Sequence, residues 1–147
     1  MAAPGENLRI NPDRLWNSIH ELAEIGPGVA GGSNRQTLTD DDKKGRELFR
    51  RWCEGAGMSM GLDQMGTMFA RREGTDPSLD PVFVGSHLDT QPTGGRYDGV
   101  LGVLSGLEVI RTLNDLGKLV NRVPQTVRVD PEIFAGRHRC PISGSGS

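Results

Sequence analysis

A short apolar segment that leads into a histidine constrains the fold of this chain more than any other feature. Residues 82–84 are Val-Phe-Val, and proline and glycine flank them, so the segment 81–84 favours a buried strand over a helix. His87 and Asp89 follow directly, and Asp98 lies eleven positions after His87, beyond a glycine-rich turn. This arrangement is typical of a strand that carries metal ligands at its carboxyl end.

The histidine and the carboxylates behind it have the chemistry of a metal site. Neutral imidazole binds divalent transition metals well, and a ligating histidine commonly donates its second ring N–H to a carboxylate or a carbonyl. Asp89 is placed to take that orienting role for His87. A carboxylate such as that of Asp98 can bridge two metals about 3.5–4 Å apart, which would hold a water beside a substrate carbonyl. Asp-Thr and Asp-Gly pairs are also ordinary turn chemistry, so spacing alone leaves both interpretations open.

The remaining sequence predicts alternating helices and strands. Helix starts are expected at Asn11 and Pro12, at Thr39 or Asp40, and at Asp98 or Gly99. The third of these helices is apolar on most faces and is expected to pack on a sheet, with glycines at 99, 102 and 106 allowing close approach to the strand before His87. Short strands are expected at 58–62 and 67–71. The pattern predicts an α/β fold.

Composition and charge narrow the classes of partner. The chain has 147 residues, which fits one domain, and a net charge of -2 with acids and bases interspersed. There is no basic patch for nucleic acid and no reason to expect an anionic membrane, so a small-molecule partner fits better. No segment has the apolar length of a membrane span or the pattern of a leader, and a cytoplasmic location is expected. Cys53 and Cys140 are far apart, which argues against a disulfide framework and a thiolate zinc site; Cys53 is expected to be a packing residue.

Residues 85–103 resemble the first metal-binding motif of the family of N-carbamoyl-L-amino-acid hydrolases, allantoate amidohydrolases and β-ureidopropionases. This family belongs to the larger group of di-zinc aminoacylases and carboxypeptidases. The segments 38–49 and 66–72 resemble it as well, so the match covers roughly residues 7–119. The resemblance implies His87 and Asp98 as metal ligands, with Asp98 as the bridge.

The same resemblance implies a reaction and a cofactor. The reaction is hydrolysis of a linear amide, ureido or amidine C–N bond in a small N-carbamoyl or ureido substrate, with a metal-activated water attacking the carbamoyl carbon. The cofactor is a pair of divalent metals, Zn, Mn or Co. Asp89 takes the role of orienting His87. Intact members of the family are homodimers, and the resemblance identifies no substrate-binding residue.

The resemblance also implies a partial three-layer α/β sandwich of the di-zinc exopeptidase type, without the lid and dimerisation domain. Residues 1–119 would form the N-terminal part of the catalytic domain. The pattern stops after Leu119, and a truncation, frameshift or deletion is expected there. The Glu-Glu pair that supplies the general base and the next ligand has no counterpart, and neither Glu132 nor His138 is expected to replace it. Residues 120–147 are expected to form an atypical, poorly ordered tail.

Two functions from different classes stay open. The first is a metal-dependent amidohydrolase whose truncated chain has little or no activity by itself. The second is a non-catalytic α/β remnant or binding module that lacks a complete metal site. The number of ligands distinguishes them, because a catalytic zinc typically has three protein ligands and an open position. The sequence offers two such ligands, His87 and Asp98.

Overall fold

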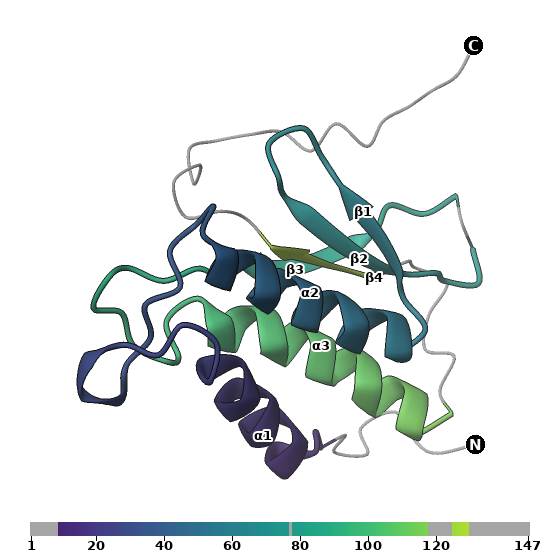
Figure 1. Cartoon of the computed structure of the whole chain (residues 1–147). Helices are drawn as coiled ribbons and strands as arrows, with labels where there is room; N and C mark the ends of the chain where they lie inside the picture. The colour runs from purple at the N-terminus through teal and green to yellow at the C-terminus, as the bar shows by residue number, and fades with distance from the viewer. Residues whose placement is uncertain (1–8, 77, 118–124, 130–147) are drawn as a thin grey trace.

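The computed structural model describes residues 9–76, 78–117 and 125–129, which form a four-stranded sheet with the α-helices on one side of it (Figure 1). The mixed sheet and its helices confirm the predicted α/β class. The elements in chain order are α1 (Pro12–Ala23), the short 3-10 helix η1 (Val29–Gly31), α2 (Asp40–Gly55), β1 (Ser59–Leu62), β2 (Met68–Arg72), β3 (Val82–Ser86), α3 (Val100–Asp115) and β4 (Gln125–Val129).

The first two helices begin where their capping residues predict. Asn11 accepts a hydrogen bond from the backbone N–H of Arg14 at 3.0 Å, and Pro12 occupies the first turn of α1. Thr39 caps α2 in the same way by accepting from the N–H of Asp42 at 3.2 Å. Both helix starts therefore follow from local chemistry.

The third helix lies close against β3 because two of its glycines face that strand. A Cβ at Gly102 would lie 2.9 Å from the Cβ of Ser86, and a Cβ at Gly106 would lie 2.8 Å from Cγ1 of Val84. Any larger residue would force the helix away from the sheet. The predicted close approach is confirmed.

The sheet has the strand order β1-β2-β4-β3. β1, β2 and β4 are antiparallel neighbours, whereas β3 and β4 are parallel and are joined through α3 as a βαβ unit. Ser86 pairs in register with Val129, so β3 and β4 finish at the same edge of the sheet. Ligand sites in α/β sheets gather at such carboxyl ends, and His87 follows β3 there.

The prediction of a poorly ordered tail is wrong for residues 125–129, because these residues form β4. Val127 and Val129 have no exposed surface and point into the core, while β2 and β3 pair with the strand on its two sides. Long-range pairing of this kind leaves little local signal in a five-residue segment. Glu132, His138 and Cys140 lie outside the described residues.

The prediction that the strand at 81–84 is buried is also wrong. The strand is there, as β3, but Val82, Phe83 and Val84 are 60%, 41% and 45% exposed. β3 is an edge strand, with β4 on one side and α3 over one face. Within the described residues no element covers its outer edge.

One apolar core joins the sheet to the helices that face it. Side chains from β2 and β4 meet those of α2 and α3, and α1 packs against α3. Cys53 lies fully buried in this core, as predicted. Across the part of the chain that the structure describes, none of the helices has the length and apolar character needed to cross a membrane.

Candidate metal centre

His87 stands at the carboxyl end of β3, with its ring packed on the backbone of Gly99. A Cβ at Gly99 would lie 2.4 Å from Cε1 of His87 and 2.5 Å from each ring nitrogen. Gly99 has φ 69° and ψ -51°, and the N–H of Val100 donates to the carbonyl of Asp98 at 2.7 Å, which closes a γ-turn. The ring of His87 therefore packs on the residue that directly follows Asp98 in the chain.

The protonation pattern of His87 follows from its hydrogen bond. Nδ1 lies 2.9 Å from the backbone carbonyl of Asp89. A carbonyl can only accept, so Nδ1 carries a hydrogen, and in the neutral ring the lone pair is then on Nε2. The side chain is 21% exposed, so it is neither fully buried nor free in solvent. This is the tautomer that a histidine needs to bind a metal through Nε2.

The carboxylate of Asp98 is exposed and makes no hydrogen bond or ion pair with any described residue. Asp89 differs, because it is buried and its Oδ2 accepts a hydrogen bond of 2.6 Å from the hydroxyl of Thr37. Its Oδ1 lies 3.8 Å from Nδ1 of His87, which is too far for a hydrogen bond. Asp89 therefore contacts His87 mainly through its backbone carbonyl, and the orienting role of its carboxylate stays a prediction.

Two residues that the sequence did not single out, Arg35 and Thr37, lie beside this loop. The guanidinium of Arg35 is buried and donates to the carbonyl of Leu88, between His87 and Asp89. Burial lowers the pKa of Arg35, and the nearby acids partly offset this effect. An arginine after a glycine-rich loop carries no local signal of burial, because its partners are distant in sequence.

The loop before Asp98 is held against α1 by side chains. Arg96 donates to the carbonyl of Gly31, and its Nη1 lies 3.3 Å from Nδ1 of His20. The ring of Tyr97 stacks on Trp16, with 6.1 Å between ring centroids. The two residues that precede Asp98 are therefore held in place by side-chain contacts.

The centre is incomplete in the part of the chain that the structure describes. Among residues 9–76, 78–117 and 125–129, no group of three or more His, Cys, Asp or Glu side chains is arranged to hold a metal ion. His87 and Asp98 fit a metal by their chemistry, since one offers a neutral nitrogen and the other an unpaired carboxylate. A catalytic metal needs at least one more ligand.

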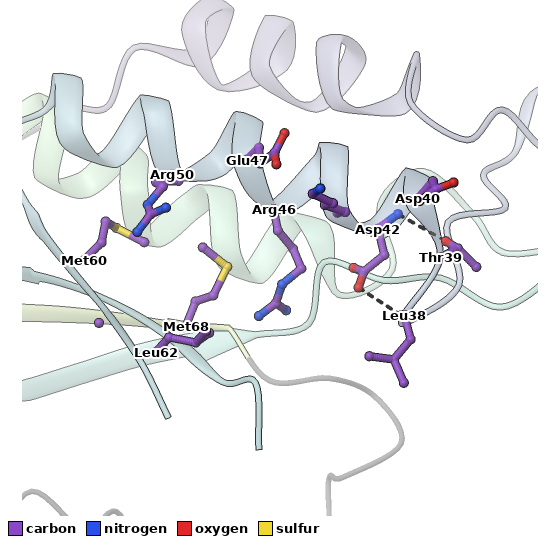
Figure 2. Close-up of a pocket in the computed structure, with 12 residues that line it drawn as sticks. Leu38, Thr39, Asp40, Asp42, Arg46, Glu47, Arg50, Met60, Leu62 and Met68 are labelled. Carbon is purple, nitrogen blue, oxygen red and sulfur yellow. Dashed lines mark hydrogen bonds between the residues drawn. The ribbon is translucent and has the colours of Figure 1, made fainter. Parts of the chain in front are cut away.

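A separate groove of about 380 Å³ lies between α2 and the β1–β2 hairpin (Figure 2). Arg46 reaches into it between Met68 and Leu62 on one side and Asp42 on the other (Figure 2). Its lining carries three cations and three carboxylates, so it offers no net charge to an ionic ligand. His87, Asp89 and Asp98 are not among the lining residues. The groove is distinct from the candidate metal centre.

Comparison with known proteins identifies clear relatives. No family model matches the chain. The chain is 73% identical over 117 residues to an N-carbamoyl-L-amino-acid amidohydrolase from Rhizobium meliloti, covering 80% of this chain and 28% of the relative. It is 37% identical over 136 residues to an N-carbamoyl-L-amino acid amidohydrolase from Geobacillus stearothermophilus, covering 92% and 33%.

A solved structure shares the fold. A hydantoinase/carbamoylase family amidase from Burkholderia ambifaria superposes with a TM-score of 0.82 at 52% identity, over 84% of this chain and 30% of the other. The chain thus spans about a third or less of the length of the curated relatives and of this structure. Over the residues matched, the homologues of this chain are N-carbamoyl-L-amino-acid amidohydrolases and an amidase of the hydantoinase/carbamoylase family.

Proposed function

We propose that this chain supplies His87 and Asp98 as part of the metal centre of an amidohydrolase that acts on N-carbamoyl-L-amino acids. The observation that carries the proposal is the geometry of His87: Nδ1–H donates to a carbonyl, Nε2 is left as a lone pair, and the ring rests one residue from Asp98. The names of the relatives supply the substrate class.

Two side chains of this chain would bind metal, and backbone groups next to them would hold those side chains in place. Nε2 of His87 and the carboxylate of Asp98 would hold divalent metal, either Zn, Mn or Co. The metal would supply a bound water of lowered pKa and a positive charge beside the developing oxyanion. The carbonyl of Asp89 keeps His87 in the required tautomer, and the γ-turn at Gly99 holds Asp98 next to the ring.

The chain by itself is proposed to have little or no turnover. Among the described residues no group of three metal-binding side chains is found, whereas a catalytic zinc normally has three protein ligands. The named relatives favour an amidohydrolase over a non-catalytic binding module. A cytoplasmic location, homodimerisation, and the absence of nucleic acid and membrane partners stay predictions.

Metal content measured by mass spectrometry on the purified 147-residue protein tests the metal proposal. After incubation with Zn²⁺, Mn²⁺ or Co²⁺ and removal of excess metal, the protein should retain metal, and His87→Ala and Asp98→Ala should each retain less. Asp80→Ala is the control, since it removes an exposed acid outside the centre. Equal retention by all four proteins would refute the roles of His87 and Asp98.

Turnover is tested separately with N-carbamoyl-L-amino acids and allantoate in the presence of each metal. We expect no release of product above background. Robust turnover that His87→Ala abolishes would show that the chain is catalytically sufficient. That result would refute the proposed inactivity while supporting the metal site.

A further inference from the structure

Arg35 is a buried cation whose guanidinium donates only to backbone carbonyls. It is 1% exposed. Nε and Nη2 donate to the carbonyl of Leu88 at 3.2 and 2.8 Å, and Nη1 donates to the carbonyls of Leu22 and Ile25 at 3.0 and 2.8 Å. Buried arginines are usually paired with a carboxylate, yet no described carboxylate accepts a hydrogen bond from this guanidinium. Its position is therefore set by the backbone that it binds.

The backbone of Arg35 binds the same loop a second time. Its N–H donates to Oγ1 of Thr90 at 2.7 Å, and its carbonyl accepts from the N–H of Thr90 at 2.8 Å. The loop is thus tied at Leu88 by the guanidinium and at Thr90 by the main chain. His87 and Asp89 flank Leu88, so the peptide planes next to both residues have little freedom.

These contacts bear on the tautomer of His87. Nδ1 reaches the carbonyl of Asp89, two residues ahead, only while the chain between them keeps its present turn. We propose that Arg35 is a positioning residue, which by fixing the carbonyl of Leu88 holds this turn and so keeps the lone pair of His87 on Nε2. The proposal rests on the metal-site function proposed above.

Gly45 of α2 provides the space that Arg35 occupies. A Cβ at Gly45 would lie 2.7 Å from Cδ and 3.1 Å from Nε of Arg35. Gly45→Ala would therefore displace the guanidinium without removing its charge. Gly55 lies in the same helix, and a Cβ added there would have no atom within 4 Å, so Gly55→Ala is a matched control.

Arg35→Lys is the second informative variant. A lysine keeps the positive charge, but its single ammonium cannot place two donors on one carbonyl and two more on separate carbonyls in a fixed plane. If charge alone mattered, Arg35→Lys would resemble the wild type. If the forked geometry matters, Arg35→Lys and Gly45→Ala should behave alike.

The experiment measures the tautomer of His87 directly, without metal. The full chain is labelled with ¹⁵N in histidine, and the imidazole ¹⁵N shifts are recorded well above the ordinary histidine pKa, with His87→Gln used for assignment. The wild type and Gly55→Ala should show Nδ1–H. Arg35→Lys and Gly45→Ala should show a mixture shifted toward Nε2–H, and titration with Zn²⁺ should give roughly 10- to 100-fold weaker binding than the wild type.

The outcomes separate this proposal from the proposed function. Retention of the Nδ1–H form by folded Arg35→Lys and Gly45→Ala would overturn it, and so would an equal shift in Gly55→Ala. A shifted tautomer in a protein whose wild type binds no metal would support the positioning role and refute the metal function. If Arg35→Lys does not fold, Gly45→Ala decides. If neither folds, Arg35 serves the stability of the fold alone and the proposal fails.

Discussion

Replacing Gly99 by alanine should strain the backbone at this position and displace the ring of His87 at the candidate metal centre. The backbone of Gly99 has φ 69° and ψ -51°, a region that a residue with a Cβ occupies at a cost of about 1–3 kcal/mol. The new Cβ would lie 2.4 Å from Cε1 of His87, whereas ordinary contacts begin near 3.4 Å. The ring would have to withdraw by roughly 1 Å, at about 0.5–1.5 kcal/mol if it leaves its rotamer.

Together these effects lower the free energy of unfolding of Gly99→Ala by about 1.5–4.5 kcal/mol. Urea denaturation followed by circular dichroism measures this loss. Two other glycines separate its sources. Gly66 has φ 84° with no atom within 4 Å of an added Cβ, so Gly66→Ala shows a backbone effect alone. Gly95 has neither a positive φ nor a close neighbour, so Gly95→Ala should be close to neutral.

The ring displacement has its own readout, which is the hydrogen bond from Nδ1 of His87 to the carbonyl of Asp89. The imidazole ¹⁵N shifts of His87 should change in Gly99→Ala and stay constant in Gly66→Ala and Gly95→Ala. A loss of stability no greater than that of Gly66→Ala, together with an unchanged His87 spectrum, would refute the contact between Gly99 and the ring.

Two further predictions concern buried groups away from the centre. Arg14 donates to the buried carboxylate of Glu108 at 2.9 and 2.8 Å. Arg14→Ala should therefore lower the free energy of unfolding, measured by urea denaturation, by about 3 kcal/mol, and the double variant Arg14→Met with Glu108→Leu should lower it less. A loss below about 1 kcal/mol in Arg14→Ala would contradict this prediction. Burial raises the pKa of the Cys53 thiol from 9.0 to about 12, so its stabilising contribution is complete below pH 9 and is lost as the pH rises from 9 toward 12. Both proteins compared carry Cys140→Ser, and one of them also carries Cys53→Ala. In this window the free energy of unfolding of the protein that keeps Cys53 should fall more steeply, by up to about 1.4 kcal/mol per pH unit, than that of the Cys53→Ala protein. Equal slopes would contradict the raised pKa of Cys53.

Local patterns in the sequence predicted most of the elements. Asn11 and Thr39 cap helices through hydrogen bonds to residues three positions ahead, so their role is visible in a short window. His87, Asp89 and Asp98 lie within twelve consecutive positions around one strand end and one turn. A close approach of Gly99 to the strand before His87 was likewise expected, whereas its contact with the ring of His87 was not.

Contacts between distant segments could not be predicted in the same way. β4 is a central strand because β2 and β3 pair with it, and those pairings join residues more than 40 positions apart. The exposure of β3 likewise depends on its edge position, because an apolar run has the same pattern whether or not another element covers it. Such features depend on which segments meet.

The sequence by itself determined the chemistry of the candidate centre: an imidazole and a carboxylate, placed after a strand and before a helix. The tertiary structure decided how that chemistry is held. Arg35 binds Leu22, Ile25 and Leu88, and Thr37 binds Asp89, across separations of 10 to 53 residues. A hydrogen bond forms only when donor and acceptor lie about 3 Å apart, so only the folded chain brings these groups close enough to bind each other.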